Sequence, residues 1–148
     1  MQSHFDLDTA VAHCVGPPRL VACMITMCVR DGADRLTIGP DPRPQVIGVR
    51  VTYSISGKRH ELIPPPIAVL PKIIKVLRAI STGEENECPL RLSGHEFAGS
   101  ISIEARSGGE HATIELPLLP NVAPAAAALL DEFTDENGLM EFEDDDFP

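Results

Sequence analysis

Residues 49–81, VRVTYSISGKRHELIPPPIAVLPKIIKVLRAIS, decide the fold of this chain. Apolar residues at every second position predict a strand over residues 46–55, because successive side chains of a strand point to opposite faces. The Ser56-Gly57 pair is typical of a hairpin turn and predicts a partner strand over residues 58–63. We expect the following side chains of the first strand to share one face: Ile47, Val49, Val51, Tyr53 and Ile55.

A helix is expected after the hairpin. Pro64-Pro65-Pro66 lacks backbone donors and ends the sheet pairing. Beyond it, Leu70, Ile73, Ile74, Leu77 and Ile80 recur at helical spacing. Three basic residues fall on the opposite side of this helix: Lys72, Lys75 and Arg78. We interpret them either as a solvated helix face or as a surface for an anionic partner.

The flanking sequence predicts an α+β fold. A short helix is expected within residues 1–16, capped by Asp6 or Asp8, and a second over residues 19–30 that ends at Gly32. Strands are expected over residues 33–38, 90–92, 100–105 and 112–116, with a turn at residues 107–109 and a last helix over residues 123–133. The proline-rich residues 39–44 are expected to form an exposed loop. Helices first and strands in hairpins favour an antiparallel sheet packed with helices.

Charge divides the chain into regions. Residues 131–148 hold nine of the 22 acidic residues and no Lys or Arg, whereas the rest is close to neutral. We expect an N-terminal helical segment (residues 1–18), one α+β domain (19–133) and an acidic disordered tail (134–148). A body without a net basic balance does not favour nucleic-acid binding.

The tail mixes bulky apolar residues with acids. Leu139, Met140 and Phe142 stand among the acidic residues of the tail. This composition is used by segments that fold on a partner, and equally by solubilising tails. A third hypothesis is that the acids fold back onto Lys72, Lys75 and Arg78.

No catalytic or metal-binding constellation is evident. Cys14, Cys23, Cys28 and Cys88 do not have zinc-site spacing and are expected to be reduced and mostly buried, although His13 beside Cys14 leaves a metal site as an alternative. The five histidines are dispersed, and no phosphate-loop motif occurs. We therefore expect a chain that is not an enzyme and needs no cofactor.

The sequence also bears on location. No run approaches the roughly 18 apolar residues of a membrane helix, and no secretory signal is visible at the N-terminus. We expect a cytoplasmic protein without membrane insertion.

The central block resembles a known family. His60-Glu61-Leu62-Ile63-Pro64-Pro65-Pro66, placed between a hairpin and a helix, is similar to a segment in the N-terminal domain of the ATPases of type II secretion and type IV pilus assembly. Residues 32–40, GADRLTIGP, resemble a second segment of that domain. The resemblance covers roughly residues 20–117 and implies a PAS-like fold, but no ATPase core is present.

The charged positions of that family differ in this chain. Its acid and histidine fall on Arg35 and Thr37, and its two arginines fall on Thr52 and Ser54. These arginines help the family contact nucleotide, which Ser and Thr cannot do. Arg50, two residues before Thr52 on the same strand face, could have taken over part of this role.

Two function classes follow. The first is a non-catalytic protein-interaction or regulatory domain related to these ATPase domains, acting through its sheet or through the helix after the prolines. The second is a sensor of a small ligand, such as a nucleotide second messenger or a metabolite. The candidate interaction residues are Lys72, Lys75, Arg78, Leu139, Met140 and Phe142.

Overall fold

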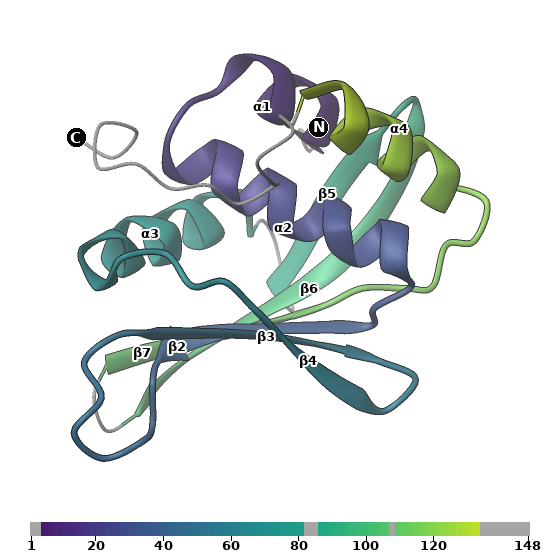
Figure 1. Ribbon diagram of the computed structural model, residues 1–148. Helices are drawn as coiled ribbons and strands as arrows, with labels where there is room; N and C mark the ends of the chain where they lie inside the picture. Colours follow the sequence, from purple (N-terminus) through teal and green to yellow (C-terminus); the bar gives the residue numbers. More distant parts are fainter. Residues whose placement is uncertain (1–3, 82–85, 107–108, 134–148) are drawn as a thin grey trace.

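The computed structural model describes residues 4–81, 86–106 and 109–133. One sheet and one layer of helices make up the fold (Figure 1). The helices are α1 (Leu7–His13), α2 (Pro17–Asp31), α3 (Leu70–Ile80) and α4 (Ala123–Phe133), and a 3₁₀ turn, η1 (Ile67–Val69), leads into α3. The strands are β1 (Phe5–Asp6), β2 (Arg35–Pro40), β3 (Val49–Ile55), β4 (Lys58–Leu62), β5 (Glu87–Leu92), β6 (His95–Arg106) and β7 (Gly109–Glu115).

The seven strands are ordered β1-β5-β6-β7-β2-β3-β4. All neighbours are antiparallel except β1, which pairs parallel with β5 through Phe5–Leu90 and Asp6–Arg91. The α+β class is therefore confirmed, but the purely antiparallel sheet is wrong. The sequence does not predict this parallel pair, because a two-residue strand is too short to produce an alternating pattern.

The helices cover a single face of the sheet (Figure 1). α2 lies at the centre of the helical layer and contacts α1, α3 and α4. Every residue of α2 from Leu20 to Val29 is buried, and Thr26 satisfies its hydroxyl by donating to the Ala22 carbonyl at 2.7 Å. A helix that is apolar all round belongs inside a core, so α2 is the element around which the others pack.

Local signals set several helix ends as expected, but α2 begins at Pro17 rather than Arg19, because proline is tolerated in the first turn of a helix. Asp6 caps α1 by accepting a hydrogen bond from the Thr9 backbone N–H at 3.1 Å. Gly32 ends α2 in the left-handed conformation, with φ of 73°. The apolar stripe of α3 is buried at Leu70, Ile73, Ile74 and Leu77. These predictions are confirmed because capping and periodicity are local properties.

Two predictions around the proline-rich loop are wrong. Gly39 and Pro40 continue β2, opposite Arg50 and Val49 of β3, because a proline at a strand's last residue interrupts few ladder bonds. The next strand begins at Val49 rather than residue 46, and Ile47 is 87% exposed instead of facing the core. The turn before it includes Gln45 at φ of 67°, which reverses the chain before pairing starts.

The remaining strands are of the type expected from the sequence but differ from the expectation in length. β4 ends one residue early, while β5, β6 and β7 reach beyond the short strands expected. The Ser56-Gly57 hairpin turn is confirmed, with φ of 51° and 82°. The expected turn at residues 107–109 and the acidic tail lie wholly or mostly outside the described residues. No helix in the described ranges is both long and apolar enough to cross a bilayer.

Candidate functional site

The basic residues of α3 do not form one uniform surface. Lys72 and Lys75 are exposed, whereas Arg78 donates from Nη1 to Oε1 of Glu110 on β7 at 3.2 Å and forms an ion pair with it. This pairing lowers the pKa of the Glu110 carboxyl and raises that of Arg78. Arg78 therefore already has an acidic partner among the described residues. Leu139, Met140 and Phe142 lie outside the described residues.

The second face of the sheet carries a hollow that we call the basic hollow. None of the described helices covers this face, which lies below the sheet in Figure 1. The volume of the hollow is about 450 Å³. Its lining consists of Arg35, Thr37, Gly39, Pro40, Pro42, Arg50, Thr52, Ser54, Arg59, Arg106 and His111. Four guanidinium groups from four strands thus surround one concavity.

Strand register explains why these residues meet. Arg35 of β2 stands opposite Ser54 of β3, which stands opposite Arg59 of β4. Thr37 and Thr52 pair in the same way, two residues along each strand. Since side chains alternate between faces, these polar residues point away from the helices while Leu36, Ile38 and Val51 enter the core. The alternation that builds the core therefore also gathers the arginines.

The four arginines are neutralised to different degrees. Arg50 pairs with Glu61 at 2.7 Å, and Arg106 pairs with Glu104 at 3.0 Å. The Arg35–Glu115 pair is longer, at 3.6 Å, and both side chains are more than half exposed. Arg59 forms no ion pair with any other residue in the described ranges. The least neutralised end of the hollow is therefore the row formed by Arg35, Ser54 and Arg59.

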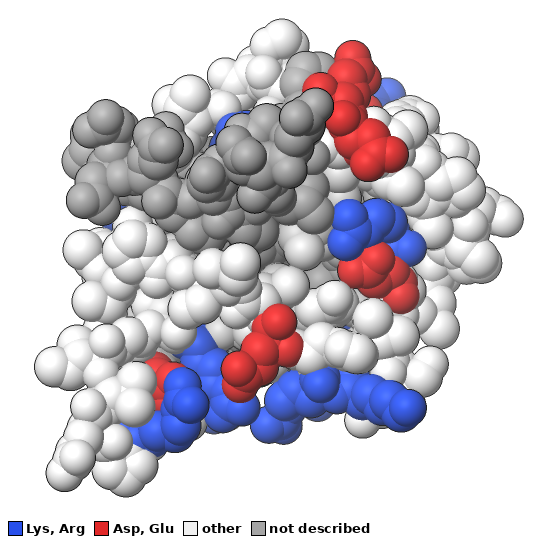
Figure 2. Space-filling model, in the orientation of Figure 1, with Lys and Arg blue, Asp and Glu red and all other residues white. Residues whose placement is uncertain are grey.

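Basic side chains are prominent on the surface at this end of the molecule. Figure 2 shows Lys and Arg gathered along the lower border of the view, below the helical layer, with acidic side chains between some of them. Basic side chains therefore outnumber acidic ones along this border but are interrupted by them. Such a surface attracts anions mainly at low ionic strength, because exposed charges are screened over roughly 8–10 Å in physiological salt.

His111 lines the basic hollow beside Gly39. Its imidazole occupies the space next to Gly39 that a side chain would otherwise fill. Its Nδ1 is buried and has no hydrogen-bond partner among the described residues. Buried polar atoms are usually paired, so an unpaired ring nitrogen marks this position as unusual for a purely structural histidine.

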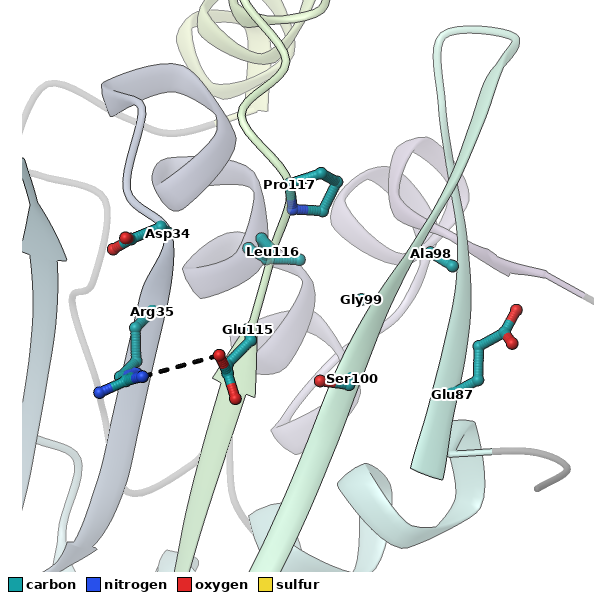
Figure 3. A pocket seen from close by; sticks show the side chains of 9 residues that line it. All are labelled: Asp34, Arg35, Glu87, Ala98, Gly99, Ser100, Glu115, Leu116 and Pro117. Atoms are coloured by element: carbon teal, nitrogen blue, oxygen red, sulfur yellow. Dashed lines mark ion pairs between the residues drawn. The ribbon is translucent and has the colours of Figure 1, made fainter. Parts of the chain in front are cut away.

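A second hollow, which we call the acidic hollow, adjoins the first. It has a volume of about 570 Å³ and includes the carboxylates of Asp34, Glu87 and Glu115. Figure 3 shows Arg35 and Glu115 facing each other from neighbouring strands, with Ser100 next to Glu115 on β6. Arg35 lines both hollows, so its weak pair with Glu115 forms the boundary between them.

Four positions singled out in the sequence line this site. They are Thr37, Arg50, Thr52 and Ser54, and all of them line the basic hollow. Sequence reasoning missed Arg59, Arg106 and His111. The turn at Ser56-Gly57 could have located Arg59, because a two-residue turn places it opposite Ser54.

The cysteines offer little reactivity. Cys23, Cys28 and Cys88 are buried, and burial raises the pKa of the Cys28 and Cys88 thiols to about 12. No cluster of three or more metal-ligating side chains occurs in residues 4–81, 86–106 and 109–133. The chemistry that the described residues support at the basic hollow is binding of anionic groups by guanidinium and hydroxyl donors.

Comparison with models of protein families and with curated protein sequences found no match to this chain.

Proposed function

We propose that this chain is a non-catalytic protein-interaction domain that binds an acidic segment of a partner protein in the basic hollow. The observation that supports the proposal is the convergence of Arg35, Arg50, Arg59 and Arg106 on one concavity of the uncovered sheet face. Guanidinium groups bind carboxylates through paired, charge-assisted hydrogen bonds. Thr37, Thr52 and Ser54 supply neutral donors between them.

The sheet is preferred to α3 as the binding surface. Arg78 of α3 already has an acidic partner in Glu110, whereas Arg59 has none in the described residues. The hollow also gives a concave shape, and the exposed side chains of a single helix do not. An extended acidic segment could lie across β2, β3 and β4 and meet several guanidinium groups at once.

The test is direct binding of a model partner. A fluorescein-labelled peptide rich in Asp and Glu is titrated with the full chain at low salt, and binding is followed by fluorescence anisotropy. We expect saturable binding that weakens as salt rises. A peptide with Asn and Gln in place of the acids is expected to bind at least tenfold more weakly.

Matched variants separate the sheet from the helix. The double substitution Arg35→Gln with Arg59→Gln is expected to reduce affinity about tenfold or more. Lys72→Gln with Lys75→Gln removes the same charge from α3 and is expected to change affinity less than twofold. Equal losses in both variants would mean that the attraction is non-specific, and a loss in the α3 variant alone would move the site to the helix.

A small-ligand sensor is the second candidate. The volume of about 450 Å³ lies within the roughly 300–1,000 Å³ typical of small-molecule pockets. Thermal shift against mono- and dinucleotides and common anionic metabolites tests this function. Strong stabilisation by one compound, without binding of the acidic peptide, would favour the sensor.

We also propose that the domain is related to the N-terminal, PAS-like domain of secretion and pilus ATPases and acts in the cytoplasm. The support is the similarity of residues 32–40 and 60–66 together with the hairpin-then-helix order of β3, β4 and α3. Its partner is then a secretion or pilus component. Failure of purified ATPase cores and pilus assembly proteins to bind the chain, measured by biolayer interferometry, would count against this relation.

A further inference from the structure

The row formed by Arg35, Ser54 and Arg59 has features that distinguish it from the rest of the basic hollow. Arg35 and Arg59 lie on β2 and β4, on either side of Ser54 on β3. With strands spaced about 4.8 Å apart, the two arginine backbones are about 10 Å apart. Two long side chains at this separation can converge on one group held above Ser54.

The positive charge of this row that is not neutralised by acidic residues is larger than the single negative charge of a carboxylate. Arg59 has no acidic partner among the described residues, and Arg35 is held only by the exposed 3.6 Å pair with Glu115. Exposed pairs of this kind contribute little, so Arg35 can exchange Glu115 for a stronger anion. Arg50 and Arg106, by contrast, have closer partners in Glu61 and Glu104.

We propose that this row is a subsite for a phosphate monoester, and specifically for a phosphorylated side chain in the acidic segment of the partner protein. The inference rests on the proposed function. A phosphate group carries a charge of about −1.5 to −2 at pH 7 and presents three acceptor oxygens. It matches two guanidinium groups and one hydroxyl, whereas a carboxylate offers two oxygens and a single charge.

The remaining contacts of Ser54 are compatible with this role. Its carbonyl accepts a hydrogen bond from the Asp34 N–H at 3.0 Å, which fixes the backbone of β3 at this position. Its side chain is half-buried in the hollow, and the hydroxyl forms no hydrogen bond with another described residue. The hydroxyl is therefore available as a third donor between the two arginines.

The test uses three labelled acidic peptides that differ at one central residue: phosphoserine, glutamate or serine. Anisotropy titrations with the full chain are expected to give at least tenfold tighter binding for phosphoserine than for glutamate. Arg59→Lys keeps the charge but removes the planar fork of donors. This substitution is expected to weaken binding of the phosphoserine peptide about tenfold and binding of the glutamate peptide less than threefold.

Arg106→Lys is the matched control, because it makes the same change within the hollow but outside the row. It is expected to leave the preference for phosphoserine unchanged. Equal affinity for the phosphoserine and glutamate peptides would overturn the subsite and leave the proposed function standing. Absence of binding by all three peptides would overturn both.

Two further arms identify the source of the phosphate. Inorganic phosphate and free phosphoserine are tested alone by thermal shift and as competitors of the labelled peptide. Competition only at concentrations at least a hundredfold above that of the peptide supports a protein partner. If either compound binds as tightly as the peptide, the proposal of a phosphorylated partner protein is wrong, and the natural ligand is a small phosphorylated molecule.

Discussion

The imidazole of His111 lies directly against Gly39 on the neighbouring strand, in space that any larger residue at position 39 would fill. A methyl carbon at residue 39 would stand 2.3 Å from His111 Cδ2 and 2.6 Å from Cγ. Contacts this short do not occur between non-bonded carbon atoms, so a side chain at residue 39 and the present position of the His111 ring exclude each other. The absence of a side chain at Gly39 on β2 thus gives the His111 ring on β7 the space that it occupies.

Gly39→Ala is expected to displace the His111 ring and to reduce the free energy of unfolding by about 1–3 kcal/mol, as overpacking does elsewhere. Urea denaturation measures this loss. The double variant Gly39→Ala with His111→Ala provides the control, since removing the ring should relieve the clash and restore part of the stability. A single variant with unchanged stability would show that the ring moves at no cost.

Leu77 tests the role of α3 in the core. Its side chain is fully buried, so Leu77→Ala is expected to reduce the free energy of unfolding by about 2–5 kcal/mol. Lys75→Ala, two residues earlier on the exposed face, is expected to change it by less than about 0.5 kcal/mol. Similar effects of the two substitutions in urea denaturation would contradict the orientation of the helix.

The cysteines are expected to react in two classes with a thiol reagent under native conditions. Cys14 is half-buried, whereas Cys23, Cys28 and Cys88 are buried. A thiol whose pKa is raised to about 12, such as Cys88, is ionised in only about one molecule in ten thousand at pH 8, and the thiolate is the reactive form. One fast thiol followed by three slow ones, with the fast one lost in Cys14→Ser, is the expected result.

Stability is expected to fall as pH rises above about 9. Burial holds the pKa of Cys28 and Cys88 near 12 in the folded chain, whereas in the unfolded chain these thiols ionise near their ordinary value of 9.0. The unfolded state therefore loses protons first, and the stability present below pH 9 decreases between the two values. Urea denaturation at pH 8, 9 and 10 measures this slope.

Cys88→Ala supplies the control for the pH dependence. The variant should show a shallower decline above pH 9 than the unmodified chain, although its stability at pH 8 is lower because of the cavity. Identical slopes would show that other groups, such as Tyr53, whose pKa is raised by burial, cause the decline.

Local sequence patterns predicted most elements but not their full extent. The caps at Asp6 and Gly32 and the apolar stripe of α3 depend on residues within one or two turns, so they could be read from the sequence. The start of β3 at Val49 and the pairing of Gly39 with Arg50 depend on where a neighbouring strand begins. The parallel contact of β1 with β5 joins residues about 85 positions apart and has no local signal.

The sequence by itself determined that Val49–Ser81 forms a hairpin followed by an amphipathic helix, because periodicity, a turn pair and prolines act locally. It also placed Thr37, Thr52 and Ser54 on two expected strands, over residues 33–38 and 46–55. Only the tertiary structure decided that these positions share one hollow with Arg59, Arg106 and His111. Register between strands distant in the chain sets which side chains meet, and that register is fixed by packing of the helices on the opposite face.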